Sequence, residues 1–192
     1  GTVELYTNNG NKTFKKATII IEDKNLKNTT PTLGDIDGDG VLDLIVGESK
    51  GTISVYKGKW VNNTLTFNNK GTILKEANLN ANVGQFPALS LGDLSGSGKL
   101  ELIVGDATGY LKRYDINYPN VEFKGYLEGE TLNPKGDRRL WGGYYSVPLL
   151  RDLDKDGRVD IIVGQVEFGL PIPIDWDIFP YKEDFKNSLE IA

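Results

Sequence analysis

DIDGDGVLDLIVG, residues 35–47, joins an acidic turn to an apolar run, and this combination decides the fold of the chain. Two similar stretches follow, ALSLGDLSGSGKLELIVG (88–105) and VPLLRDLDKDGRVDIIVG (147–164). The first acidic residues of the three turns lie about 58 residues apart, and self-similarity at a fixed spacing is the signature of a repeat protein. Each repeat therefore forms one supersecondary unit.

The apolar runs LDLIVG, LELIVG and VDIIVG are short and rich in β-branched residues, which predicts buried inner strands. Other expected strands carry turn residues at their ends: GTVELYTNN at the N-terminus, 12–21, 51–58, 64–74, 109–115 and 169–176. We expect an all-β fold of β-propeller-type blades, about three four-stranded antiparallel sheets. Because propellers typically close with about 4–8 blades, the ring is expected to be incomplete.

The repeats predict two regions. Residues 1–168 hold the three propeller repeats, with acidic loops at 35–43, 93–101 and 152–160. Residues 169–192 form a Pro- and aromatic-rich segment, in which Pro171 and Pro173 each lack a ladder donor. This segment is expected to cap the last sheet or to act as an arm that docks on another chain. EDFKNSLEI within it could form a short helix.

The first acidic loop has the donor pattern of a calcium site. Side-chain oxygens recur at positions 1, 3, 5 and 9, Gly40 permits a sharp bend, and the residue at position 7 offers a carbonyl. Ca²⁺ takes 6–8 oxygens, whereas Mg²⁺ keeps more of its waters. An EF-hand would need Glu at position 12, where this loop has Val46. The expected ligands are Asp35, Asp37, Asp39, Val41 and Asp43.

The other two loops differ in their donors. The third keeps the full set, and its expected ligands are Asp152, Asp154, Asp156, Arg158 (carbonyl) and Asp160. The second has serines in place of two aspartates, and its expected ligands are Asp93, Ser95, Ser97, Lys99 (carbonyl) and Glu101. We therefore expect two strong Ca²⁺ sites and one weaker site, with ordinary Asp/Gly turns as the alternative.

Composition excludes several kinds of chemistry. The chain has no His and no Cys, so a Ser-His or Cys-His nucleophile and a disulfide framework are impossible. The net charge is −5, which disfavours nucleic acid as a partner. Ten of the 27 acidic residues lie in the three loops, so the acidity is local and directed at metal.

The motif D-x-D-x-D-G-x-x-D, followed by an apolar strand ending in Gly and a strand G-x-[apolar]-x-x-Tyr, resembles the FG-GAP/VCBS family. This family includes the calcium-binding blades of integrin α-subunit propellers. The resemblance covers roughly residues 1–170. It implies that the aspartates of loops 1 and 3 bind calcium between strands, while the serines of loop 2 and the prolines near the end depart from the pattern.

Two further groups of residues are candidates for function. DRRLWGGYYS contains candidate ligand-binding residues, because aromatic and Arg side chains are favoured at binding surfaces: Arg138, Arg139, Trp141, Tyr144 and Tyr145. The alternative is that Trp141 and Tyr145 pack between blades while the arginines are solvated. Three N-x-S/T sequons predict possible N-glycosylation at Asn11, Asn28 and Asn62.

We expect a non-catalytic, extracellular or cell-surface module that mediates adhesion, ligand binding or surface assembly, with structural Ca²⁺. Its partner would be a protein or glycan, or a second copy that completes the ring, and no membrane span is expected. One alternative is a carbohydrate-active enzyme such as a polysaccharide lyase, with Asp137, Arg138, Arg139 and Tyr144 as its site. Another is a subunit of an extracellular filament or surface layer. The chain opens with Gly1, which suggests a matured product or a piece of a longer protein.

Overall fold

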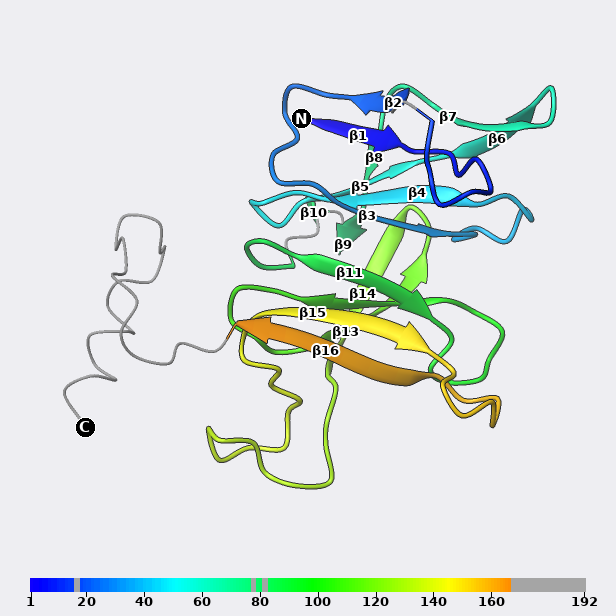
Figure 1. Cartoon of the computed structure of the whole chain (residues 1–192). Coiled ribbons are helices and arrows are strands. Elements are labelled where there is room, and N and C mark those ends of the chain that lie inside the picture. Colours follow the sequence, from blue (N-terminus) through cyan, green and yellow to red (C-terminus); the bar gives the residue numbers. More distant parts are fainter. Residues whose placement is uncertain (16–17, 77–78, 81–82, 167–192) are drawn as a thin grey trace.

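In the computed structural model of the chain, residues 1–15, 18–76, 79–80 and 83–166 are described. Every regular element in these segments is a β-strand, which confirms the expected all-β class. Figure 1 shows the small sheets stacked along the molecule, with β1 and β2 at one end and β15 and β16 at the other. Within these segments no helix has the length and apolar character needed to cross a bilayer.

The first complete blade is a four-stranded antiparallel sheet of order β3-β4-β5-β8. Its strands are β3 (Thr30–Gly34), β4 (Asp43–Gly47), β5 (Ile53–Tyr56) and β8 (Thr72–Ile73). The register pairs Thr32 with Ile45 and Leu44 with Tyr56. A separate hairpin, β6 (Gly58–Val61) and β7 (Thr64–Phe67), is inserted before the last strand. The single strand expected over 64–74 is therefore wrong, because the chain turns between β7 and β8.

The second complete blade repeats this order with β11 (Ala88–Gly92), β12 (Glu101–Gly105), β13 (Lys112–Asn117) and β14 (Asn120–Tyr126). Two short strands extend its outer edge: β9 (Lys75–Glu76) and β10 (Leu79–Asn80). β14 pairs with β9 in parallel at a single position. The LELIVG run is the second strand from one edge, as the repeat predicts.

Two-stranded sheets lie at the two ends of the stack (Figure 1). β1 (Thr2–Leu5) pairs with β2 (Thr18–Glu22), and β15 (Tyr144–Arg151) pairs with β16 (Asp160–Val166). The expected strand over 12–21 is shorter than predicted, since a separate bridge joins Asn8 to Phe14. The expected strand over 169–176, the capping segment 169–192 and its possible helix lie outside the described residues.

The strands joined by each acidic loop form an inner strand pair: β3–β4, β11–β12 and β15–β16. Side chains alternate between the two faces of each inner strand pair. We name the face that points toward the next blade in chain order the forward face. Its members occupy the same repeat positions each time: Thr30, Thr32, Gly34, Ile45 and Gly47; Ala88, Ser90, Gly92, Ile103 and Gly105; Val147, Leu149, Arg151, Ile162 and Gly164. The opposite, rear face is leucine-rich, as in Leu89 and Leu91 of the second blade.

The core consists of layers between successive blades. One cluster joins Ile45 of the first blade to Leu102 and Val104 on the rear face of the second. Another joins Ile103 to Leu150 and the rear face of β15–β16. A third packs β1 and β2 on the rear face of the first blade. Burying one large aliphatic side chain contributes about 1.5–3 kcal/mol, so these layers hold the blades together.

Small residues on the forward face set the distance between blades. A Cβ added at Gly105 would lie 2.1 Å from the backbone oxygen of Ser146 in the next blade. A Cβ added at Gly47 would make tighter-than-usual contacts with the side chains of Pro87 and Leu89, at 3.1 and 3.3 Å. Real Cβ atoms do not come as close to backbone as 2.1 Å, so Gly105 permits this approach.

We expect Gly105→Ala to lower the free energy of unfolding by about 2–3 kcal/mol, because the added methyl forces two blades apart. Gly164→Ala is the matched control at the same repeat position, since its nearest contact would be an ordinary 3.8 Å. Urea unfolding of both variants measures the difference. Equal losses at the two sites would contradict the role of the glycine in blade spacing.

Candidate metal centre

Loop 1 connects β3 to β4 and curls around one carboxylate. Asp35 accepts hydrogen bonds from the amides of Gly38 at 2.8 Å, Asp39 at 3.1 Å and Gly40 at 2.8 Å. Gly38 and Gly40 have φ of 77° and 82°, which L side chains rarely adopt. The expectation that Gly40 permits a sharp bend is therefore confirmed.

The loop brings its first three acidic residues together. One carboxylate oxygen from each of Asp35, Asp37 and Asp39 lies within 4.8 Å of the others. Asp43, at the start of β4, is completely buried and accepts hydrogen bonds from the amides of Gly58 at 2.9 Å and Ile36 at 3.4 Å. The carbonyl role of Val41 stays a prediction.

A lysine that the motif did not include lies among these carboxylates. The Lys57 ammonium is 2.6 Å from Asp37, 2.9 Å from Asp43 and 3.4 Å from Asp39. Burial by itself lowers the pKa of Lys57, but hydrogen bonds and charges from Asp37 and Asp43 outweigh it and raise that pKa above its ordinary value. Lys57 is therefore fully charged at neutral pH.

Loop 3 connects β15 to β16 and repeats the curled form. Asp152 accepts hydrogen bonds from the amides of Lys155 and Gly157, and its carboxylate clusters with those of Asp154 and Asp156 within 4.8 Å. Asp160 accepts from the amide of Leu153 at 2.9 Å. The only basic side chain bonded to these carboxylates among the described residues is that of Arg158, which pairs with Asp156 and holds the pKa of that carboxyl below its usual value.

Loop 2 has the same backbone form with fewer charges. Asp93 accepts from the amides of Gly98 at 2.7 Å and Ser97 at 2.9 Å, and these bonds lower its pKa. The hydroxyls of Ser95 and Ser97 bond to each other at 3.0 Å. Glu101 is turned toward the loop backbone, where the amides of Leu94 and Ser95 donate to it. Among the described residues, loop 2 holds no cluster of three carboxylates like those of the other two loops, and the role of the Lys99 carbonyl stays a prediction.

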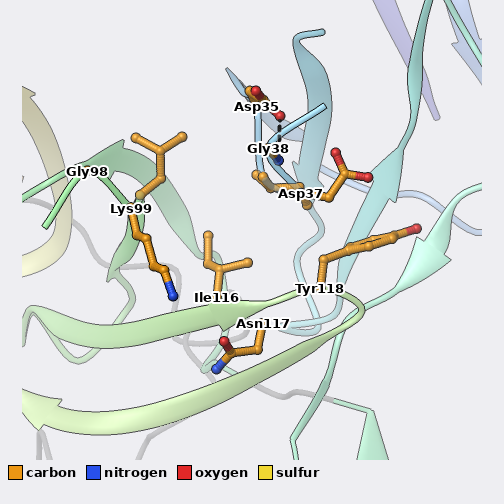
Figure 2. Close-up of a pocket in the computed structure, with 10 residues that line it drawn as sticks. Asp35, Asp37, Gly38, Gly98, Lys99, Ile116, Asn117 and Tyr118 are labelled. Carbon is orange, nitrogen blue, oxygen red and sulfur yellow. Dashed lines mark hydrogen bonds between the residues drawn. The ribbon is translucent and has the colours of Figure 1, made fainter. Parts of the chain in front are cut away.

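Loops 1 and 2 face each other across a pocket of about 510 Å³. Figure 2 shows Asp35 and Asp37 on one side, Lys99 on the other, and Ile116, Asn117 and Tyr118 at the turn between β13 and β14. The Tyr118 ring lies 5.8 Å from the Lys57 ammonium. The two loops thus lie on the same side of the blade stack.

The donor sets differ in how well they fit a hard divalent cation. Loop 3 offers three clustered carboxylates, and Asp160 beside them, which is the all-oxygen chemistry that Ca²⁺ prefers. Loop 1 offers the same set, but the Lys57 ammonium lies among its members. Loop 2 offers the Asp93 carboxylate and two hydroxyls, with Glu101 beside them. Loop 3 is therefore the best match for calcium in the part of the chain that the structure describes.

The candidate ligand-binding residues of DRRLWGGYYS do not all lie together in the structure. Arg139 stacks on Tyr110, with its guanidinium carbon 4.2 Å from the ring centroid, and pairs with Asp137 at 2.5 Å. Lys135 lies over the Trp141 ring at 4.9 Å and the Tyr144 ring at 5.4 Å.

The other two candidates point elsewhere. Arg138 donates to the carbonyl of Glu130 at 3.0 Å, and Tyr145 packs edge-on against Phe86. Asp137 and Arg139 neutralise each other, so the geometry gives no support to an enzymatic site there. The motif also missed Lys135 and Tyr110, which lie in the folded group but outside DRRLWGGYYS.

Comparison with known proteins supports the repeat class. The family described as FG-GAP-like repeat matches residues 1–46, the segment from β1 through loop 1 into β4. The N-terminal part of the chain thus carries an FG-GAP-like repeat, as the motif indicated, while the integrin-like calcium chemistry stays a prediction. No solved structure matches the chain.

Two curated relatives bear the name KICSTOR complex protein ITFG2. The protein from Bos taurus is 27% identical over 139 residues, which is 70% of this chain and 24% of the relative. The protein from Mus musculus is 27% identical over 138 residues, or 70% of this chain and 28% of the relative. The chain therefore spans about a quarter of the length of these relatives.

The expected extracellular or cell-surface location is wrong. The relatives are named as proteins of a complex, and this points away from an extracellular location. Calcium-type loops and sequons suggested that location, but the same acidic turns can serve any protein that needs a tight β-turn with a bound or built-in cation. Asn11, Asn28 and Asn62 remain sequence matches without support from the comparisons.

We expect Asp43→Asn to destabilise the chain by about 3 kcal/mol, because it removes a buried partner of Lys57. Asp39→Asn is the matched control: this carboxylate is exposed and lies 3.4 Å from the same ammonium, so it should cost under about 1 kcal/mol. Thermal unfolding in EDTA compares the two. A larger loss at Asp39 would contradict the assignment of Asp43 as the buried anchor.

Proposed function

We propose that the chain is a non-catalytic β-propeller segment that assembles with further propeller blades. One observation carries this proposal. Ile45, Ile103 and Ile162 occupy the same position on three forward faces, and they are 1%, 0% and 47% exposed. The first two are covered by the next blade. The third has no such cover among the described residues, so its face is suited to receive another blade.

The rest of this face has the same character. Val147 and Leu149 on β15 and Val166 on β16 are exposed as well. A group of exposed apolar side chains marks an interaction site. Gly164 repeats the glycine that Gly47 and Gly105 use for close approach, yet nothing described lies within 3.4 Å of its added Cβ. The spacing device is present at a face without its neighbour.

The opposite end of the stack offers a complementary surface. Leu33 on the rear face of the first blade is 50% exposed, because β1 and β2 cover Leu44 and Val46 but not the β3 side. Its counterparts Leu91 and Leu150 pack against the forward face of the preceding blade, near Gly34 and Gly92. A second copy can thus present Leu33 to the forward face of β15–β16, with β16 beside its β1.

The relatives support a role in protein assembly. Both are named as proteins of a complex, and a repeat module whose terminal blade faces are not covered by any described blade suits that role. The proposed partner is therefore a protein with the leucine-rich rear face of a propeller blade. A second copy is the source that can be tested with this chain alone.

We further propose that Ca²⁺ stabilises loop 3, with Asp152, Asp154, Asp156 and Asp160 as its ligands. The clustered carboxylates repel one another, and a bound cation would remove that repulsion. A cation that binds only the folded chain stabilises it by mass action. The metal would therefore have a structural role.

We expect the wild-type chain to self-associate as its concentration rises from about 1 to about 200 μM, the range of a micromolar interface. Ile162→Asp should keep it monomeric, because a carboxylate on this face cannot be buried without a partner. Val61→Asp, an exposed apolar position on β6, is the matched control and should associate like the wild type. Light scattering measures the mass. A wild-type chain that stays monomeric throughout would contradict assembly through a second copy.

We expect Ca²⁺ at one hundred times its dissociation constant to raise the free energy of unfolding by about 2.7 kcal/mol. The double variant Asp152→Asn/Asp156→Asn should lose most of this gain. Glu4→Gln removes an exposed carboxylate of β1, away from the three loops, and serves as the control. Calorimetry with calcium and with EDTA measures the effect. Full stabilisation of the double variant by calcium would overturn the assignment to loop 3.

A further inference from the structure

We propose that Lys57 is a built-in counter-ion of loop 1: its ammonium takes the place of a shared cation and competes with Ca²⁺ for the loop. This inference rests on the proposed calcium chemistry of the loops and distinguishes loop 1 from loop 3. Lys57 is not part of the calcium-loop motif, since it lies 14 positions after Asp43, the last acidic residue of the loop.

The strand register places Lys57 at the loop. Leu44 pairs with Tyr56, the last residue of β5, so the residue that follows this strand, Lys57, comes beside Asp43 at the start of β4. Backbone bonds fix this segment, because the Lys57 carbonyl accepts from the amide of Asn68 at 3.0 Å and the amide of Gly58 donates to Asp43. From this backbone position, the extended Lys57 side chain reaches the loop directly.

The ammonium reaches three carboxylates at once. It is 2.6 Å from Asp37, 2.9 Å from Asp43 and 3.4 Å from Asp39, which stand at positions 3, 9 and 5 of the loop. These are the side chains that a calcium ion would share. A cation bound to them would lie against the ammonium, and the two positive charges would repel each other. Calcium binding to loop 1 therefore requires Lys57 to leave.

The other two loops handle their charge differently. At loop 2, the residue of β13 opposite Glu101 is Asp115, not a lysine. Arg113, also on β13, approaches Glu101 only to 3.8 Å. In loop 3, Arg158 pairs with Asp156 from a side chain that is 87% exposed. In the described segments, Lys57 is the one basic side chain with ion pairs to three carboxylates of the same loop.

The two loops with four aspartates therefore differ in how their negative charge is neutralised. Loop 1 belongs to the first complete blade and is neutralised by Lys57 of the same blade, so its order does not depend on the ambient concentration of calcium. Loop 3 lies beside the forward face of β15–β16, which no described blade covers, and its carboxylates remain available to a metal. Calcium would then act at the assembly end of the stack and leave the first blade unaffected.

The test isolates loop 1 in the full chain with Asp152→Asn/Asp156→Asn, which removes the loop 3 ligands. In this background, Lys57→Gln should bind Ca²⁺ at least about ten-fold more tightly than Lys57 does, because the competing charge is gone. Isothermal titration with CaCl₂ measures the affinity. Lys57→Arg keeps the charge and should bind as weakly as the parent. Lys59→Gln, an exposed lysine on β6, is the matched control and should change nothing.

A second readout guards against a misfolded variant. In EDTA, Lys57→Gln should melt below Lys59→Gln, and added calcium should restore the lost stability. Equal calcium affinity of Lys57→Gln and its parent, or no calcium binding by Lys57→Gln, would overturn the inference. Failure of the proposed loop 3 site is distinguishable, because it appears as an absence of calcium stabilisation in the chain with loop 3 intact.

Discussion

The close approach of successive blades is the constraint on which the rest of this structure depends. Each inner strand pair presents a face of small residues, with Ile45 or Ile103 at its centre, to the leucines of the next blade. A glycine at the end of the strand permits contact with the neighbouring backbone, as at Gly105. The pattern is the same in each repeat, so the third forward face, on β15 and β16, is built for a neighbour that the described residues do not provide.

The acidic loops follow from the same geometry. Each connects the first two strands of its blade, on the same side of the stack, where the chain must turn sharply and the first aspartate accepts hydrogen bonds from the amides of the turn. The remaining carboxylates need compensation, and the three repeats differ in how they obtain it. The first uses the ammonium of Lys57, the second replaces carboxylates by the hydroxyls of Ser95 and Ser97, and the third leaves its carboxylates clustered near Arg158.

Much of the fold could be predicted from the sequence, because the apolar runs and the Gly-rich turns recur with a fixed spacing. The hairpin β6–β7 could not, since nothing in a local pattern distinguishes a continuous strand from one that turns at Asn68 and Gly71. The acidic residues of loops 1 and 3 were identified from their spacing, but Lys57 was not, because its proximity arises from strand pairing. The register opposite Asp43 was the available signal. The extracellular location was predicted wrongly because it was inferred from the calcium-type loops and sequons, which are associated with that environment. No residue of the chain itself specifies the location.

The central claim is that no blade in the described part of the chain covers the forward face of β15–β16. Amide hydrogen exchange of the full chain, at a concentration where it is monomeric, tests this most directly. β4, β12 and β16 share one sequence pattern, but only the first two are paired on both edges and covered by a following blade in the described structure. The account predicts that residues 160–166 exchange at least about ten-fold faster than residues 101–105, since local opening costs less where burial and pairing are incomplete. Equal protection of the two strands in the monomer would contradict it.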